Sequence, residues 1–184
     1  MADNSQVTIP QRAQLSETLA ASSKNCQMKH RTNFEANRLR EVLLNGTFIA
    51  NTNFKDQITK VSWQDSIKKF YNLNTIAVLT FHINYYLAGL IGAFRTGKLE
   101  IRDIYSFDML PIKSEADWMN LVETFLTNAE EFCLEIESLP SERLDEIFID
   151  PKYGSFLRNI EAMIEHSYYH LGQIVLIRKL INHT

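Results

Sequence analysis

The sequence is poor in the residues that a sheet protein, a disulfide-stabilised protein or a nucleic-acid-binding protein would need. Its 184 residues include only six glycines and four prolines, which leaves few turn signals for a many-stranded sheet. The two cysteines, Cys26 and Cys133, form no CxxC pair, which excludes a cysteine framework and fits a reducing compartment. No run of lysine and arginine forms a basic stripe, so nucleic acid is not expected as a partner. These absences favour a single helical domain with one apolar core.

Long apolar runs are also scarce, and only one raises the question of a membrane. The N-terminus lacks the apolar segment of a secretion signal, so export is not expected. Residues 76–94 carry no charged side chain and are long enough for a membrane span. At their centre lie His82, Asn84, Tyr85 and Tyr86, polar groups that would be costly in lipid without partners. We therefore predict a buried helix, no membrane contact and a cytoplasmic protein.

Charge is distributed unevenly along the chain, although the net charge is only -3. Residues 115–150 hold 11 acidic side chains and, on the basic side, only Arg143. We interpret this segment as a solvated acidic helix face rather than as a site for a cationic partner.

Apolar periodicity predicts a polar extension followed by one all-α domain. Residues 1–31 are expected to be loosely ordered or to form a short helix, and residues 32–184 to form a four-helix bundle. The four helices are predicted at residues 33–45, 74–94, 114–139 and 155–181. A shorter helix is plausible at 65–70. The connection at 98–113 is long enough to be a crossover or the wall of a pocket.

Caps and apolar seams support these helices. Ser114 and Asp117 match a capping box at the start of the third helix, and Pro140 follows its end. Asn74 and Ser155 can cap the second and fourth helices, and Gly46 is expected to end the first. Its seam residues repeat at steps of 4, 3, 4, 3 and 4: Trp118, Val122, Phe125, Ala129, Phe132 and Ile136. The first helix is expected to turn four residues inward: Phe34, Leu39, Val42 and Leu43.

Two histidines interrupt the apolar stripe of the fourth predicted helix. One face is shared, at steps of 3, 4, 4 and 3, by Met163, His166, His170, Ile174 and Ile177. Because a buried imidazole costs free energy unless its ring nitrogens are bonded, a partner is expected there. Histidines at i and i+4 can bind one metal ion, with nitrogens about 2.0–2.1 Å from zinc.

The second predicted helix carries a third histidine, His82, on a face that includes Gly89 and Gly92. The glycines would allow another helix to approach closely or leave room for a ligand. A three-histidine site leaves at least one coordination position for water or substrate, as catalytic zinc sites do. The ion can then lower the pKa of a bound water or thiol, or polarise a carbonyl. Coincidence is the competing interpretation, since HxxxH is common on amphipathic helices.

Other metal motifs are absent from the sequence. Ser167 follows His166, so the HExxH pattern of zinc proteases is missing. No Glu-x-x-His occurs, which argues against a di-iron carboxylate bundle. His30 and His183 lie near the ends of the chain and are expected to be solvated.

The residues around these histidines resemble the DinB-like superfamily. The second helix contains LNTIAVLTFHINYY (residues 73–86), and the fourth contains IEHSYYHLGQIVLIRKL (164–180). Two further strings are similar to a subgroup of that family: ANTNFKDQ (50–57) and KYGSFLRN (152–159). The resemblance covers residues 34–181 and leaves out the N-terminal extension.

The resemblance implies a four-helix bundle with a long crossover connection and one divalent ion, nickel or zinc. His82 matches the ligand on the family's second helix, while His166 and His170 match the pair on its fourth. Characterised relatives include S-transferases and isomerases that use low-molecular-weight thiols such as bacillithiol, mycothiol or glutathione. Homodimers are common among members, and the family name implies no contact with DNA.

Six residues near the histidines are weaker candidates for catalytic or supporting roles: Tyr85, Tyr86, Tyr169, Glu165, Gln173 and Asn84. The tyrosines can donate hydrogen bonds to a bound anion, although aromatic residues at helical spacing are more often core. The carboxylate can act as a base or accept a hydrogen bond from a metal ligand, unless it is simply solvated. The two amides can orient a ligand or satisfy buried polar groups.

We therefore predict a metal-dependent enzyme, a thiol-dependent S-transferase or a hydrolase, acting on a small-molecule substrate. The alternative is a non-catalytic metal-binding bundle that serves as a structural or sensor module. A third hypothesis is a metal-free helical interaction protein. An enzyme requires an accessible pocket beside an open coordination position, whereas a structural site requires a closed shell.

Overall fold

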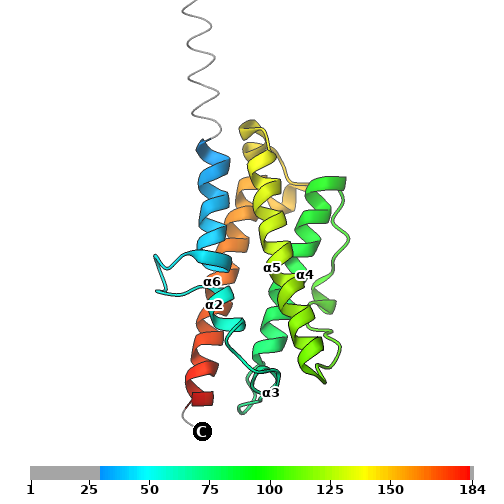
Figure 1. Cartoon of the computed structure of the whole chain (residues 1–184). Helices are drawn as coiled ribbons and strands as arrows, with labels where there is room; N and C mark the ends of the chain where they lie inside the picture. Colours follow the sequence, from blue (N-terminus) through cyan, green and yellow to red (C-terminus); the bar gives the residue numbers. More distant parts are fainter. Residues whose placement is uncertain (1–29, 183–184) are drawn as a thin grey trace, which may run out of the picture.

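The computed structural model describes residues 30–182, and this part of the chain is helical with no β-strand (Figure 1). Helical residues 30–45 end in the π-helical turn η1 (Glu41–Asn45). The later elements are α2 (Phe54–Ile58), α3 (Trp63–Ser66), α4 (Ile76–Thr96), η2 (Asp103–Tyr105), α5 (Glu115–Ser138), η3 (Ser141–Asp145), η4 (Pro151–Tyr153) and α6 (Phe156–Asn182). The predicted all-α class is confirmed. The expected extension lies outside the described residues, except that residues 30 and 31 already belong to the first helix.

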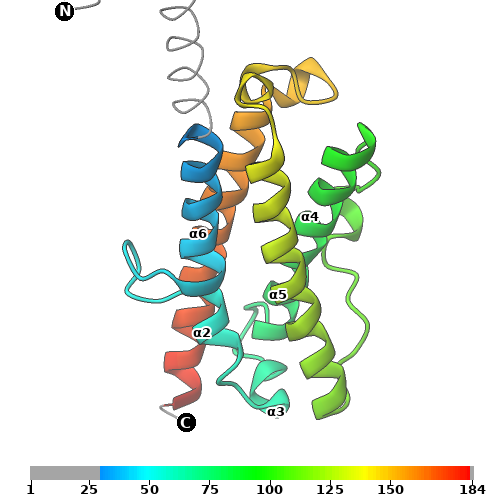
Figure 2. The ribbon, with the colours of Figure 1, turned by 45° about the horizontal axis from the view of Figure 1, so that its top comes forward.

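The four longest helical segments lie side by side (Figures 1 and 2). α4 contacts both α5 and α6, and η1 contacts α5 and α6 from the other side. Both views show α4 and α5 running in the same direction, so residues 97–114 return along the length of the helices before α5 begins. This connection lies against α4, where it can form a wall of a site.

The first helix differs from the prediction in one inward residue. Leu39, Val42 and Leu43 are fully buried as expected, but Phe34 is 53% exposed. Ala36 takes the buried position instead, because Phe34 lies on the outer side of the helix, where the guanidinium of Arg38 covers its ring at 5.9 Å. The helix ends at Gly46, as predicted.

α4 contains the long apolar segment of the sequence, and much of this helix is buried. Its cap is Thr75, whose Oγ1 accepts from the backbone N of Val78 at 3.2 Å, rather than the expected Asn74. Gly97 ends the helix with a positive φ of 70°, a conformation that suits glycine. By length and composition α4 passes for a membrane span, but 61% of its most apolar window is buried inside the protein. Such burial is typical of a core helix, while the cellular location stays a prediction.

α5 and α6 follow their predicted caps and seams. The Oγ of Ser114 accepts from the backbone N of Asp117, and the Oγ of Ser155 accepts from the backbone N of Arg158 at the start of α6. All six predicted seam residues of α5 are buried. Leu139, before Pro140, ends α5 as expected. The short helix expected at 65–70 lies slightly earlier, as α3.

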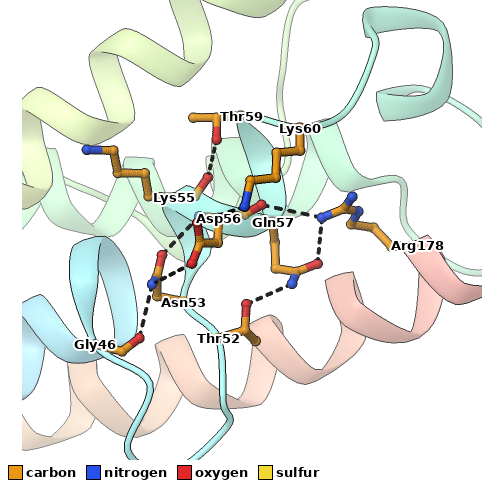
Figure 3. A network of polar contacts seen from close by, with 9 residues as sticks. All are labelled: Gly46, Thr52, Asn53, Lys55, Asp56, Gln57, Thr59, Lys60 and Arg178. Atoms are coloured by element: carbon orange, nitrogen blue, oxygen red, sulfur yellow. Dashed lines mark hydrogen bonds and ion pairs between the residues drawn. The ribbon is translucent and has the colours of Figure 1, made fainter.

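The short helix α2 is fastened to the C-terminal half of α6 by polar contacts (Figure 3). Asn53 caps α2 and donates through Nδ2 to the carbonyl of Gly46, which ties the cap to the end of the first helix. Arg178 on α6 donates to Oε1 of Gln57 at 3.0 Å. Asn53 and Gln57 of the string ANTNFKDQ therefore have structural roles, because they hold α2 against the end of the first helix and against α6.

Candidate metal centre

Three histidines from two helices meet in the interior. His82 lies in the first half of α4, and His166 and His170 lie one turn apart on α6. His82 and His170 are each 5% exposed, and His166 is partly buried. The predicted convergence of these three residues is confirmed, because α4 and α6 pack against each other where the imidazoles lie.

The three Nε2 atoms face a common point. Nε2 of His166 lies 3.1 Å from Nε2 of His82 and 2.9 Å from Nε2 of His170. One ligand atom from each residue lies within 4.8 Å of the others, which is close enough to hold a metal ion. Nitrogens bound to one tetrahedral zinc would be about 3.3 Å apart, only a few tenths of an ångström more than the distances seen here.

Two of the imidazoles are held in the tautomer that suits a metal ligand. The Nδ1–H of His82 donates to the backbone carbonyl of Ser106 at 3.1 Å. The Nδ1–H of His170 donates to Oε1 of Gln173 at 2.8 Å. With the ring proton on Nδ1, Nε2 of each residue presents a lone pair toward the common point.

This arrangement leaves the nitrogens short of protons. A neutral His166 has one ring proton, which can serve at most one of its two close contacts with the other Nε2 atoms. In at least one of the two contacts, the lone pairs of two Nε2 atoms therefore face each other, unless a cation lies between them. The donor set fits such a cation, because neutral imidazoles suit zinc, nickel, copper and iron.

Burial keeps these imidazoles in the neutral form that binds metals. Desolvation lowers the pKa of His82, although the hydrogen bond to the Ser106 carbonyl opposes this shift. Desolvation, with repulsion from the other two rings, lowers the pKa of His166 to about 4. Desolvation likewise lowers the pKa of His170. All three rings are thus free to coordinate at neutral pH.

The connection between α4 and α5 supplies one side of the site. Besides the Ser106 carbonyl, it places the ring of Phe107 on that of His82, with centroids 4.0 Å apart and planes at 13°. Its close approach needs Gly89, since a Cβ there would collide with Ile101. At Gly89 the approaching element is thus the connection, and not the helix or the ligand that was predicted.

A cavity of about 540 Å³ opens beside His166. The predicted pocket wall at 98–113 is confirmed, since Leu99, Ile101, Arg102 and Asp103 line this cavity. The other lining residues come from α4, from the loop before α6 and from α6 itself. A ligand in this cavity would lie next to an imidazole of the cluster.

Four of the six weaker candidates touch the histidines or the connection. Tyr86 lies edge-on to His82 and His166, lines the cavity, and donates its hydroxyl to Oδ1 of Asp103 at 3.1 Å. Tyr85 does not line the cavity. Its hydroxyl accepts a hydrogen bond from the backbone N of Arg102 and donates one to the backbone carbonyl of the same residue. The ring of Tyr169 lies edge-on to that of His170, and Gln173 orients His170 as described above.

The remaining two candidates lie away from the cluster. Glu165 is exposed and forms an ion pair with Arg158 at 3.1 Å. Asn84 accepts from Nδ2 of Asn128 on α5 at 2.8 Å, so its amide joins two helices. Neither lines the cavity beside His166.

Sequence reasoning missed the residues of the connection that touch the site, namely Asp103, Ser106 and Phe107. Ser106 contributes only a backbone carbonyl, which no side-chain motif reveals. Asp103 and Phe107 lie outside any regular pattern, although the unusual length of the connection was a signal that it covers a functional surface.

No family model, curated protein or solved structure matched the chain in the three comparisons made. The resemblance to the DinB-like superfamily therefore stays a prediction that rests on the sequence strings of α4 and α6.

Proposed function

We propose that this chain is a metal-dependent enzyme of the DinB-like superfamily, with a four-helix bundle and a long crossover between α4 and α5. The observation that carries the proposal is the convergence of three neutral imidazoles beside a cavity. Two of these imidazoles are already oriented by hydrogen bonds to Ser106 and Gln173. Structural metal sites usually have four protein ligands and a closed shell, whereas catalytic sites have three and an open position.

The proposed ligands are His82, His166 and His170, and the proposed ion is nickel or zinc. When bound, the ion would lower the pKa of a coordinated thiol or water and so supply a nucleophile at neutral pH. The reaction class that we favour is S-transfer from a low-molecular-weight thiol, or hydrolysis, on a small-molecule substrate.

The chain's own residues would orient the substrate and accept a proton. The apolar part of the cavity wall, which includes Leu90, Leu99 and Met163, would exclude water from the reacting groups. Asp103 is the carboxylate of that wall and can accept the proton that a thiol or water gives up. Burial raises the pKa of Tyr86, so this hydroxyl stays protonated and holds Asp103 in place.

Elemental analysis of protein purified without an affinity tag tests the metal. We expect one nickel or zinc ion per chain in the wild type and loss of that ion in His170→Ala. The matched control is His30→Ala, because His30 is exposed and lies outside the cluster. Equal metal content in His170→Ala and the wild type would refute the proposed ligand set.

A thiol-conjugation screen tests the reaction. It should pair bacillithiol, mycothiol and glutathione with electrophilic substrates, and it should include ester and amide substrates for hydrolysis. Metal-dependent turnover that disappears in His170→Ala supports the enzyme. One ion per chain without turnover would instead favour the non-catalytic structural or sensor module.

The proposal includes a cytoplasmic homodimer, on the strength of the family resemblance. Light scattering coupled to gel filtration measures the molar mass directly. A mass of one chain, 21.3 kDa, at micromolar concentration would refute the dimer.

A further inference from the structure

The wall of the cavity beside His166 is largely apolar with a few polar groups. Its apolar part includes Leu90, Ile101, Phe148 and Met163. Such a wall favours a ligand with an apolar body, and the few polar groups fix its orientation. The cavity, of about 540 Å³, is large enough for a ligand of metabolite size.

Arg102 is the only arginine or lysine of that wall. It is also the exception among the arginines of residues 30–182. Each of the others has a hydrogen bond or ion pair from its guanidinium to another side chain, whereas that of Arg102 has none. The guanidinium that is left without a protein partner is thus the one at the ligand cavity.

The backbone of Arg102 is held firmly, although its side chain is unpaired. The hydroxyl of Tyr85 accepts from the backbone N of Arg102 and donates to its carbonyl, both at 3.0 Å. Ile101, the preceding residue, lies against Gly89 on α4. The backbone at Arg102 is therefore held against α4 at the cavity wall, and its exposed side chain extends from this fixed point.

The remaining charges near the cavity favour an anion over a cation. Asp103 also lines the wall, but its Oδ1 already accepts from the hydroxyl of Tyr86. The three histidines are neutral ligands, so they would cancel none of the charge of a bound divalent ion. A single guanidinium with a carboxylate beside it suits a group of one negative charge better than a phosphate dianion.

We propose that this cavity binds a small molecule with an apolar body and one carboxylate, and that Arg102 pairs with that carboxylate. The inference rests on the proposed function in taking this molecule to be the substrate and in counting the charge of the proposed ion. Binding in the cavity does not itself require the metal.

The test uses two probes of nearly the same shape, the anion 4-phenylbutanoate and its neutral amide. Both are titrated into the full chain by calorimetry, as purified and after removal of metal by a chelator. We expect the acid to bind about tenfold more tightly than the amide, as a charge-assisted hydrogen bond predicts. Equal binding of the two probes, or no binding of either, would overturn the proposal.

Three variants locate the effect. Arg102→Gln should remove the preference for the acid, and Arg102→Lys should retain part of it. Arg158→Gln is the matched control, because Arg158 is an exposed α6 residue outside the cavity wall, and it should leave the preference unchanged. A preference that survives Arg102→Gln would refute the role of Arg102.

A fourth variant locates the binding site. Ala162→Phe should fill the cavity and weaken both probes, since Ala162 lines it. Unchanged binding in Ala162→Phe would place the probes elsewhere. Metal content, measured on the same samples, separates the two proposals: an acid preference without stoichiometric metal refutes the metalloenzyme alone, whereas stoichiometric metal without acid preference refutes this inference alone.

Discussion

Two clusters of polar side chains lie between the helices, and they differ in how their charges and hydrogen bonds are satisfied. In the first, Arg40 reaches from the N-terminal helix to Glu130 and Glu137 on α5, at 2.8 Å from Glu130. In the second, His82, His166 and His170 bring their Nε2 atoms together between α4 and α6.

The arginine cluster satisfies itself. The guanidinium of Arg40 donates to both carboxylates, and its side chain is only 17% exposed. These hydrogen bonds raise the pKa of Arg40, so the cation stays charged in this environment. The cluster needs nothing from outside, and its effect is to join two helices.

The histidine cluster does not satisfy itself. Its outer nitrogens are bonded to Ser106 and Gln173, but its inner nitrogens face one another with too few protons. A cluster whose donors and acceptors pair with one another is thus a structural feature, whereas a cluster with converging lone pairs requires a bound partner. This contrast predicts that the first cluster governs stability and the second governs ligand binding.

The largest expected effect is on metal affinity. His166→Ala removes the ligand shared by both close contacts. We expect nickel or zinc affinity to fall by about 100-fold or more, which exceeds the loss expected when a residue that only orients a ligand is replaced. After metal has been removed from both proteins with a chelator, the free energy of unfolding of His166→Ala should be within about 1 kcal/mol of that of the wild type. Competition with a chromophoric chelator measures the affinity. If His166→Ala instead unfolds the protein, the histidine cluster governs stability as well, which contradicts the proposed difference between the two clusters.

The second effect is on stability. Arg40→Met leaves Glu130 and Glu137 without their cation, and we expect a loss of about 2 kcal/mol, since the cluster is only partly buried. Urea denaturation measures it, and metal affinity should not change. Adding Glu130→Gln and Glu137→Gln should recover much of the loss, because the unpaired charges are then gone.

A smaller effect comes from the residue that orients His170. Gln173→Leu removes the acceptor of the Nδ1–H, and we expect metal affinity to fall by about tenfold. Gln173→Glu keeps an acceptor and should retain most of the affinity. Equal losses in both variants would show that packing, and not the hydrogen bond, is what matters at this position.

The smallest effect is the pH dependence of the stability of the protein from which metal has been removed. Burial lowers the pKa of His166 to about 4, below its value of about 6.5 in the unfolded chain, so the unfolded state takes up the proton first as pH falls. The stability from its neutral ring is present above pH 6.5 and is lost toward pH 4. Between pH 7 and 6 this one group should cost about 0.7 kcal/mol.

Urea denaturation of the wild type and of His166→Gln at both pH values isolates that contribution. The variant should lose less stability than the wild type over this interval. Arg40→Met should follow the wild type, because an arginine does not titrate there. An identical pH dependence in the wild type and His166→Gln would mean that His166 is solvated in the chelated protein.

Much of the fold could be predicted because helical periodicity and capping are local signals. The seam of α5 and the caps Ser114 and Ser155 were correct, since each depends on residues within one or two turns. The prediction that Phe34 points inward was wrong because it depends on contacts that are not local. It falls on an apolar position of the pattern, but which flank of the first helix is covered depends on where α5 and α6 lie.

The histidine cluster was predictable for a related reason. His166 and His170 share a face by their spacing alone, and a polar residue in an apolar stripe indicates a bound partner wherever the helix packs. The pairing of α4 with α6 was an expectation that the structure confirms. The cavity was expected only in outline, because the connection that lines it has no periodic pattern.

The sequence by itself determined that residues 30–182 are helical, where the long helices begin and end to within a turn, and which residues could serve as metal ligands, because these depend on spacings of three and four residues and on short-range hydrogen bonds. Only the tertiary structure decided that Ser106 and Gln173 orient the imidazoles, that Arg102 is the one arginine of residues 30–182 whose guanidinium has no side-chain partner, and that a cavity opens beside His166. Those features arise where segments far apart in the chain meet, and the free energy of such contacts depends on distance in space rather than along the sequence.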